Sequence, residues 1–292
     1  MPEGHKIHRI ARAFGRDFAG RTVRATSPQG RFADGAAALD GLTLVDARAV
    51  GKQLFLGFDN DRHLRVHLGL YGGWEFAGAI SEQVEIEQRV AAGPGRLVRP
   101  EPADFPAPPV GQVRLRLQTG TALADLRGPT ACVLMSGVEQ EEFLTRLGPD
   151  PLAPRTQDDE AEFVRRLRRR AVPVGQLLMD QAVVAGIGNI YRAEMLFRAS
   201  LNPFTSGKAV DAGTAAALWQ DWAHLLTIGV DTGLMLTMEG IDEQAQKLAL
   251  AGRADRHWVY RRAGLPCRVC GTEIALQEMV GRKLYWCPRC QA

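Results

Sequence analysis

The sequence predicts an α+β protein of several domains, and three patterns lead to this fold class. Short alternating or apolar runs fill residues 21–127, helical periodicity follows residue 154, and two cysteine pairs occupy the last part of the chain. At 292 residues and 31.9 kDa the chain has the length of about two domains. Hydrophobic residues make up 46% and charged residues 24%, which allows a sizeable core and excludes wholesale disorder.

One helix and a series of short strands are expected in the N-terminal part. Ile7, Ile10 and Phe14 recur at helical spacing, and Gly15 and Gly20 lie near the end of this helix. The strand candidates are 42–50, 53–58, 64–68 and 113–117. Such short strands predict a β-sandwich or a barrel. A cluster of prolines within 94–109 predicts a long loop.

Helical segments follow in the second half. Their expected ranges are 158–170, 175–185, 189–199 and 211–228. We therefore divide the chain into a β-rich domain over 1–128, a linker over 129–155, a helical domain over 156–252 and a small cysteine-containing domain over 253–292. No apolar run approaches the roughly 18 residues of a membrane span. The charged N-terminus lacks the apolar core of a signal peptide, so a reducing, cytoplasmic location is expected.

The most specific motif is a repeated Cys-x2-Cys pair. Cys267 and Cys270 form the first pair, and Cys287 and Cys290 follow after sixteen residues. Two thiolates from each tight turn complete a tetrahedron, which is the donor set of a structural zinc site. We expect one Zn2+ with no open coordination position, rather than disulfides or redox chemistry. Cys132 lies alone in an apolar run and is expected in the core.

A two-stranded hairpin is expected between the cysteine pairs, with Gly281 and Arg282 at or near its tip. Arg282 and Lys283 would project from a finger folded mainly by its metal, which suits a phosphate contact. Residues 252–292 hold eight basic and three acidic side chains, although the whole chain is only +3. A solvated basic surface is the alternative, and zinc ribbons also occur in transcription and translation.

Residues 180–192 are predicted to form a helix, a glycine-containing turn and a second helix. Asn189 is placed to cap the second helix through its side chain. Gly186 and Gly188 permit close approach, so the same helix start would present backbone N–H groups to an anion such as phosphate. An ordinary helix hairpin is the alternative.

The first residues suggest covalent chemistry. Removal of Met1 by an aminopeptidase is favoured before proline and would leave Pro2 with a free secondary amine. Such an amine forms a cationic iminium with an aldehyde, and the iminium is an electron sink for β-elimination. Glu3 beside it could transfer protons. Taken alone, a proline at position 2 has no such meaning.

Taken together, and in their order along the chain, these motifs resemble those of the Fpg/Nei family of DNA glycosylases with AP-lyase activity. Within this family, they are most similar to the endonuclease VIII branch. The resemblance spans the whole chain and implies a β-sandwich N-terminal catalytic domain, a helix-two-turn-helix DNA-binding domain and a zinc finger. The matching residues are Pro2-Glu3-Gly4, Val50-Gly51-Lys52, Leu70-Tyr71-Gly72 with Trp74, residues 177–192, and Arg282 with residues 285–291.

The resemblance also implies roles for individual residues. Pro2 would be the Schiff-base nucleophile and Glu3 the proton donor to the sugar. Lys52 would contact phosphate and assist elimination, and a solvated turn lysine is its plain alternative. Asn189 and Arg282 would hold the phosphates that flank the lesion, with Arg282 also acting in δ-elimination.

The residues expected near the lesion include both matches and departures. Leu70 and Tyr71 match residues that enter the base stack where the damaged nucleotide is extruded, which offsets part of the cost of base flipping; core packing is the alternative. Gly69 stands where related proteins carry Gln, and Lys6, after His5, replaces an acidic residue. Residues 229–252 are expected to form a loop over the lesion pocket. None of these indicates which base is preferred.

The sequence therefore predicts a bifunctional DNA glycosylase/AP lyase of base excision repair. It would remove oxidised bases, pyrimidines rather than purines, and cut the strand by β,δ-elimination. Its partner would be damaged DNA and not a membrane, and it would act as a monomer associated with the cytoplasmic nucleoid. The alternatives are an 8-oxoguanine-preferring enzyme and a non-catalytic damaged-DNA-binding protein.

Overall fold

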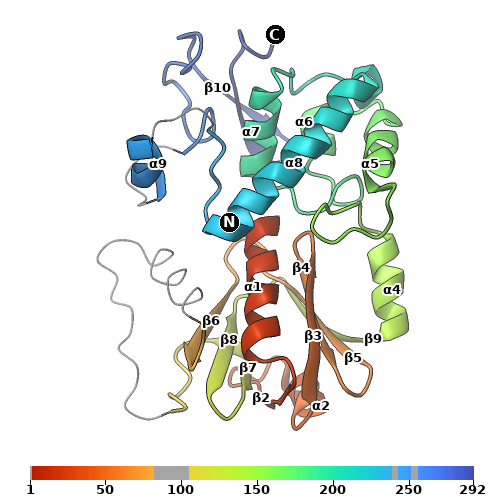
Figure 1. Ribbon diagram of the computed structural model, residues 1–292, viewed down its shortest axis with the longest axis vertical. Helices are drawn as coiled ribbons and strands as arrows, with labels where there is room; N and C mark the ends of the chain where they lie inside the picture. The colour runs from red at the N-terminus through yellow and green to blue at the C-terminus, as the bar shows by residue number, and fades with distance from the viewer. Residues whose placement is uncertain (1, 82–104, 239–242, 251–255) are drawn as a thin grey trace. The chain divides into compact units, whose positions relative to one another are not determined.

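The computed structural model describes residues 2–81, 105–238, 243–250 and 256–292 (Figure 1). The chain forms two compact units, one containing Pro2 and Lys6–Thr145 and the other containing Glu3–His5 and Arg146–Ala292. Within the described ranges, no helix combines the length and apolar character needed to cross a membrane. Most of the expected proline-rich loop and the domain boundary expected after residue 252 lie outside the described residues.

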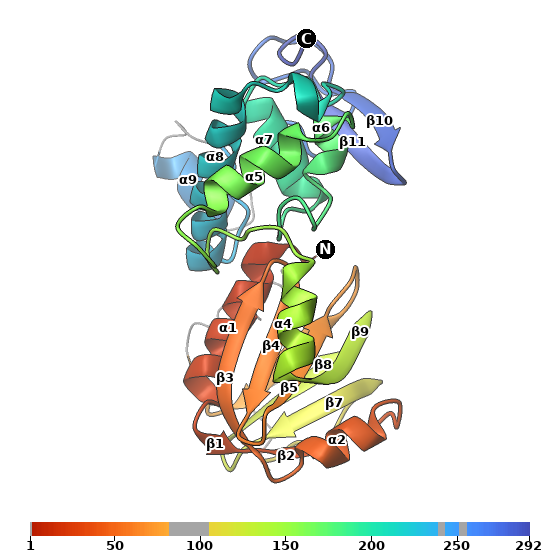
Figure 2. The same ribbon diagram turned by 90° about the vertical axis from the view of Figure 1, so that its right-hand side faces the viewer.

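The described part of the first unit contains two antiparallel sheets and three helices (Figures 1 and 2). The sheet orders are β1-β3-β4-β5-β9 and β2-β7-β8-β6. The helices are α1 (Gly4–Asp17), α2 (Ala33–Leu39) and α4 (Gly137–Thr145), and the strands are β1 (Arg21–Thr22), β2 (Arg24–Thr26), β3 (Thr43–Val50), β4 (Gln53–Phe58), β5 (Arg62–His67), β6 (Gly73–Gly78), β7 (Val113–Gln118), β8 (Ala122–Arg127) and β9 (Ala131–Ser136).

The core of this unit lies between the two sheets. Alternate residues of the longer strands enter it, such as Leu54 and Leu56 from β4 and Leu115 and Leu117 from β7. Helix α1 contributes Phe14, as its periodicity predicts. This arrangement confirms a β-sandwich and excludes the barrel.

Part of the segment expected to be a linker belongs to the sandwich. Strand β9 pairs with β5 along its whole length. Helix α4 follows directly and covers the outer face of the same sheet, where the ring of Phe143 lies 6.2 Å from that of Phe55 (Figure 2). The boundary between the two units therefore lies after Thr145. Residues 131–145 belong to the sandwich because of their strand pairing and helix packing.

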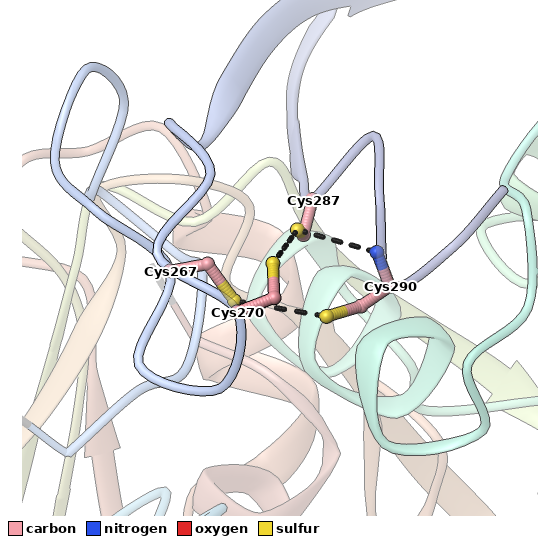
Figure 3. Close-up of side chains that lie close together, drawn as sticks. All are labelled: Cys267, Cys270, Cys287 and Cys290. Atoms are coloured by element: carbon pink, nitrogen blue, oxygen red, sulfur yellow. Dashed lines mark hydrogen bonds between the residues drawn. The ribbon is translucent and has the colours of Figure 1, made fainter.

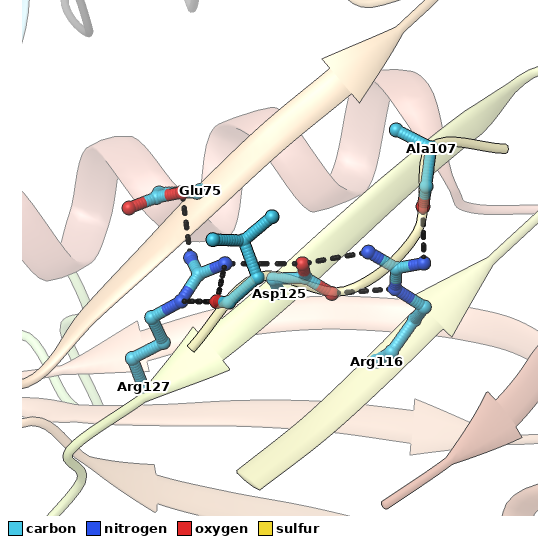
Figure 4. Close-up of polar contacts among 6 residues, drawn as sticks. Glu75, Ala107, Arg116, Asp125 and Arg127 are labelled. Carbon is cyan, nitrogen blue, oxygen red and sulfur yellow. Dashed lines mark hydrogen bonds and ion pairs between the residues drawn. The ribbon is translucent and has the colours of Figure 1, made fainter. Parts of the chain in front are cut away.

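The outer face of the other sheet carries a buried ion pair (Figure 4). Arg116 donates two hydrogen bonds to the carboxylate of Asp125, at 2.7 and 2.8 Å. Arg116 also donates to the carbonyl of Ala107 at 2.6 Å, and Arg127 donates to that of Val110 at 2.9 Å. The arginines therefore attach the segment before β7 to the sheet, and each buried charge has a partner.

The described part of the second unit is helical and ends in a hairpin. Its elements are α5 (Asp159–Arg168), α6 (Val174–Leu177), α7 (Asn189–Arg198), η1 (Gly207–Ala209), α8 (Ala212–Thr232), α9 (Glu243–Leu250), β10 (Ala275–Met279) and β11 (Arg282–Trp286). Tyr191 and Trp222 pack edge to face in its core, with ring centroids 4.8 Å apart.

Two predictions for this unit were wrong in part. The helix expected over 175–185 ends at Leu177, and turns occupy the residues up to α7. Gln181 stabilises these turns because its Nε2 donates to the carbonyls of Met179 and Ile187. Residues 229–252, expected to be a loop, include the end of α8 and all of α9.

Candidate active site

The carboxylate of Glu3 caps helix α7. It accepts hydrogen bonds from the backbone nitrogens of Gly188 at 3.0 Å, Ile190 at 2.9 Å and Tyr191 at 3.4 Å, and its side chain is fully buried. The N–H groups and the positive dipole end of a helix N-terminus both stabilise an ionised carboxylate. A Cβ on Gly188 would lie 2.3 Å from Cδ of Glu3, so glycine permits this close approach.

Asn189 was predicted to be the N-cap, and this prediction was wrong. Gly188 holds the N-cap position, and Asn189 is the first residue of the helix. Its Oδ1 accepts a hydrogen bond from Arg192, and its Nδ2 donates to the carbonyl of Lys283 at 2.8 Å. The helix start does bind an anion, but the anion is the protein's own Glu3.

Arg192 is a buried cation that the sequence analysis did not identify. It donates to the carbonyl of Lys283 at 3.1 Å as well as to Asn189. Burial and the charge of Arg282 lower the pKa of Arg192 to about 10, while the charge of Glu3 opposes this shift. The signal was its position three residues after Asn189, on the same face of the helix. The arrangement orients the Asn189 amide so that its nitrogen faces the hairpin.

Arg282 is exposed and opens strand β11, as the predicted hairpin requires. Met279 and Arg282 form the last strand pair, and Val280 and Gly281 make a two-residue turn with φ of +51° and +66°. Positive φ at both positions is typical of a type I′ turn, which favours Asn-Gly. A β-branched residue such as valine in this conformation costs about 1–2 kcal/mol.

The four predicted cysteines converge in the second unit (Figure 3). Their sulfur atoms all lie within 4.8 Å of one another, with Cys267 and Cys290 at 3.9 Å and Cys270 and Cys287 at 3.4 Å. Four thiolates at about 2.3 Å from a tetrahedral zinc ion would be separated by slightly under 4 Å, so the residues fit this metal.

Lys52 lies in the first unit, at a two-residue turn between β3 and β4. Gly51 occupies the first turn position with a φ of +59°, where a type II′ turn uses glycine. Lys52 is half-buried, and the next residue, Gln53, is paired with His67 on β5. Burial and the charges of Lys52 and Arg65 lower the pKa of His67. His67 is thus a titratable side chain influenced by Lys52 that the sequence analysis did not identify.

Leu70 and Tyr71 follow β5 and are 40% and 93% exposed, which excludes the core-packing alternative. Gly69 before them has a φ of +66°, and a Cβ there would lie 1.9 Å from Oγ1 of Thr130. The positive φ of Gly69 and the nearby side chain of Thr130 therefore both explain why glycine occupies this position.

The N-terminal residues divide between buried and exposed positions. Pro2 is buried and directly precedes Glu3. The ring of His5 is also buried and lies edge-on to Tyr191 at 5.6 Å, whereas Lys6 is exposed in a first helical turn that has no acidic residue. Burial and the charge of Glu3 raise the pKa of Tyr191, so it stays a neutral phenol.

Three family models match the chain. The formamidopyrimidine-DNA glycosylase N-terminal domain matches residues 1–132, the formamidopyrimidine-DNA glycosylase H2TH domain matches 147–239, and the zinc finger found in FPG and IleRS matches 264–292. Endonuclease 8 1 of Mycobacterium tuberculosis is 40% identical over 292 residues, covering 100% of both chains. The chain belongs to the Fpg/Nei family of DNA glycosylases.

Other Fpg/Nei proteins are similar at lower identity. The formamidopyrimidine-DNA glycosylase of Heliobacterium modesticaldum is 28% identical over 308 residues, with 100% of both chains covered. Lactococcus lactis Fpg non-covalently bound to DNA with an AP site matches with a TM-score of 0.73 and 21% identity over 99% of each chain. MutM in complex with DNA containing carbocyclic 8-oxo-G also has a TM-score of 0.73 and 21% identity, over 100% of each chain. These structures show the Fpg/Nei fold.

Membership of the Fpg/Nei family gives the class of activity. The protein is a DNA glycosylase with AP-lyase activity in base excision repair, and its partner is damaged DNA. Its four cysteines form the family's zinc finger with one structural Zn2+. The predictions of fold class, enzyme class and metal are thereby confirmed.

Proposed function

We propose that this enzyme removes oxidised pyrimidines from DNA and cuts the strand by β,δ-elimination, with Pro2 as the nucleophile. The observation that carries the proposal is the N-terminus: buried Pro2 immediately precedes Glu3, whose carboxylate is fixed by the first turn of α7. A nucleophile and a proton-transfer group are thereby held next to each other. The 40% identity to an endonuclease 8 over the full chain supports pyrimidines as the preferred bases.

The reaction begins when the amine of Pro2 attacks C1′ of the damaged nucleotide and the base leaves with the bonding electron pair. The ionised carboxylate of Glu3 accepts the proton that the amine loses, and returns it to O4′ as the C1′–O4′ bond breaks. The resulting iminium withdraws electrons, so the C2′ proton is lost and the bond from C3′ to phosphate breaks. A second elimination breaks the bond from C5′ to phosphate.

The remaining residues bind the strand around this centre. Lys52, Asn189 and Arg282 would contact phosphates, and Arg282 would also assist δ-elimination. The amide nitrogen of Asn189 carries two hydrogens, and its bond to Lys283 uses one of them, which leaves the second for a phosphate oxygen. The exposed side chains of Leu70 and Tyr71 suit insertion into the stack.

Borohydride trapping on DNA with an abasic site tests the role of Pro2, because borohydride reduces an iminium to a stable amine. Enzyme without Met1 should form a covalent adduct, and Pro2→Gly should form much less. Protein that retains Met1, identified by its intact mass, should form none because the nitrogen of Pro2 is then an amide. No adduct with the processed wild type, or an undiminished adduct in Pro2→Gly, would exclude Pro2.

A panel of duplex and single-stranded oligonucleotides, each with one oxidised base, tests the substrate class. Excision is scored separately from strand cleavage, and oxidised pyrimidines should be released fastest. Faster release of 8-oxoguanine would favour the alternative suggested by the Fpg relatives. Excision of any base would exclude a purely binding function. Because the substrate is DNA, we also propose that the enzyme associates with the nucleoid.

A further inference from the structure

Val280, in the hairpin turn of the zinc finger, has two unexpected properties. Its residue type is unfavourable for the backbone conformation of the turn, and its apolar side chain is exposed. Val280 has a φ of +51°, which β-branched residues rarely adopt, and it is 68% exposed. Asparagine followed by Gly281 would make the same turn without this strain. Folding of the hairpin therefore does not explain why valine stands here.

The turn is held in place on both sides. Met279 before it is buried, and its sulfur lies close to Gly175, 3.1 Å from where a Cβ of that glycine would be. After it, the carbonyl of Lys283 accepts hydrogen bonds from Asn189 and Arg192. Val280 is thus presented at a fixed position, two residues before Arg282.

We propose that Val280 is an apolar DNA contact that packs against the deoxyribose next to the phosphate held by Arg282. Each phosphate of a DNA strand is flanked by sugars whose C–H edges are apolar, so a side chain beside a phosphate-binding arginine meets one of them. This contact involves no charge and releases no counterions. The inference rests on the proposed function because it uses the placement of Arg282 on a phosphate.

Val280→Asn in the full-length, zinc-loaded enzyme tests this inference. Binding to a duplex with a stable abasic-site analogue is measured by fluorescence anisotropy at several salt concentrations. The Kd should rise about three- to tenfold, as expected for partial loss of an apolar contact of this size. The slope of log K against log salt should stay that of wild type, whereas Arg282→Ala should reduce its magnitude by about one. The unfolding temperature should be unchanged or higher, because asparagine suits the turn.

Val269→Asn is the matched control, since Val269 lies in a cysteine knuckle of the same finger and is 66% exposed. Its Kd should equal that of wild type. A second variant, Val280→Gly, keeps the turn and should lose as much affinity as Val280→Asn. Wild-type affinity in Val280→Asn, an equal loss in Val269→Asn, or a flattened salt slope in Val280→Asn would each overturn the inference. Failure of the proposed function would differ, because wild-type enzyme would then form no borohydride-trapped adduct.

Discussion

Gly69 shows how one residue limits the side chains available for the proposed insertion into the base stack. Its positive φ and the nearby hydroxyl of Thr130 leave no room for a side chain. A third inserting side chain at this position would require a different backbone. In the proposed function, Leu70 and Tyr71 alone would fill the space left by an extruded nucleotide, and Tyr71 is the larger and more exposed of the two.

Gly69→Ala should destabilise the first unit by at least about 1–2 kcal/mol, because alanine is strained at positive φ and its Cβ collides with Thr130. Chemical denaturation measures the change. Gly73→Ala is the control, since a Cβ at Gly73 meets nothing within 4 Å and its effect should be small. Equal effects of the two substitutions would contradict the account of Gly69.

His67 should make stability depend on pH in a defined window. Because its pKa is lowered in the folded protein by burial and by Lys52 and Arg65, the unfolded chain takes up the proton first as the pH falls. The contribution is fully present above the ordinary pKa of 6.5 and is lost as the pH falls through that value toward the lowered one. His67→Gln should flatten the dependence of the unfolding free energy on pH below 6.5, and an unchanged slope would contradict this role.

At the scale of elements, a single carboxylate of α7 fixes the start of the finger domain. Glu194 is fully buried and accepts hydrogen bonds from the backbone nitrogens of Trp258 at 2.7 Å, Val259 at 2.9 Å and Tyr260 at 2.8 Å. Thr237 donates to the same carboxylate. The chain that leads to the cysteines is thereby attached to the helix that Glu3 caps.

Glu194→Ala should be strongly destabilising, since each buried N–H left without an acceptor costs about 1–3 kcal/mol. Hydrogen exchange of the amides of residues 258–260 should accelerate before that of the α7 core. Glu139 provides the comparison because it also accepts bonds from Ser136, but at an exposed site. Glu139→Ala should cost less than about 1 kcal/mol, and a similar cost for both would contradict the importance of burial.

The elements were predictable where the pattern is local. A short apolar run identified β4, which is buried on both faces. Helical spacing identified α1, because its apolar side chains recur on the face that enters the core. The cap of α7 was not predictable, since its acceptor, Glu3, lies 185 residues from the first backbone nitrogen that it binds. Strand β9 was missed because its partner, β5, lies far back in the sequence.

At the scale of the whole molecule, the site was predictable only where chemistry depends on residue type and spacing. The cysteine pairs specify their metal from spacing alone, whereas the roles of Pro2 and Lys52 stay predictions that rest on a resemblance. Arg192 and His67 matter through burial and neighbouring charges, which no linear pattern records. The net charge of +3 is similarly uninformative beside the local excess of basic side chains in residues 252–292.

Removal of zinc should unfold the finger and leave the helices largely intact. The core around the cysteines is small, with Val259, Ile274 and Tyr285 among its members, whereas α5, α7 and α8 share a much larger core. Chelation should therefore preserve most of the helical circular dichroism while lowering DNA affinity, because Arg282 loses its fixed position. Re-addition of Zn2+ should restore the DNA affinity. An unchanged DNA affinity after complete loss of zinc would contradict this prediction.

The cap on α7 also limits how far Pro2, the proposed nucleophile, can move. Consecutive Cα atoms are 3.8 Å apart, so Pro2 is tethered to an immobilised residue by a single peptide unit. Its rigid ring adds almost no reach of its own. The nitrogen of Pro2 therefore cannot move far enough to reach C1′ of a nucleotide inside the duplex. The deoxyribose must move to the nitrogen instead. Rotation of the nucleotide out of the helix is therefore a condition for forming the first covalent bond. Nucleotides whose damage weakens base stacking would react faster than those that stay stacked.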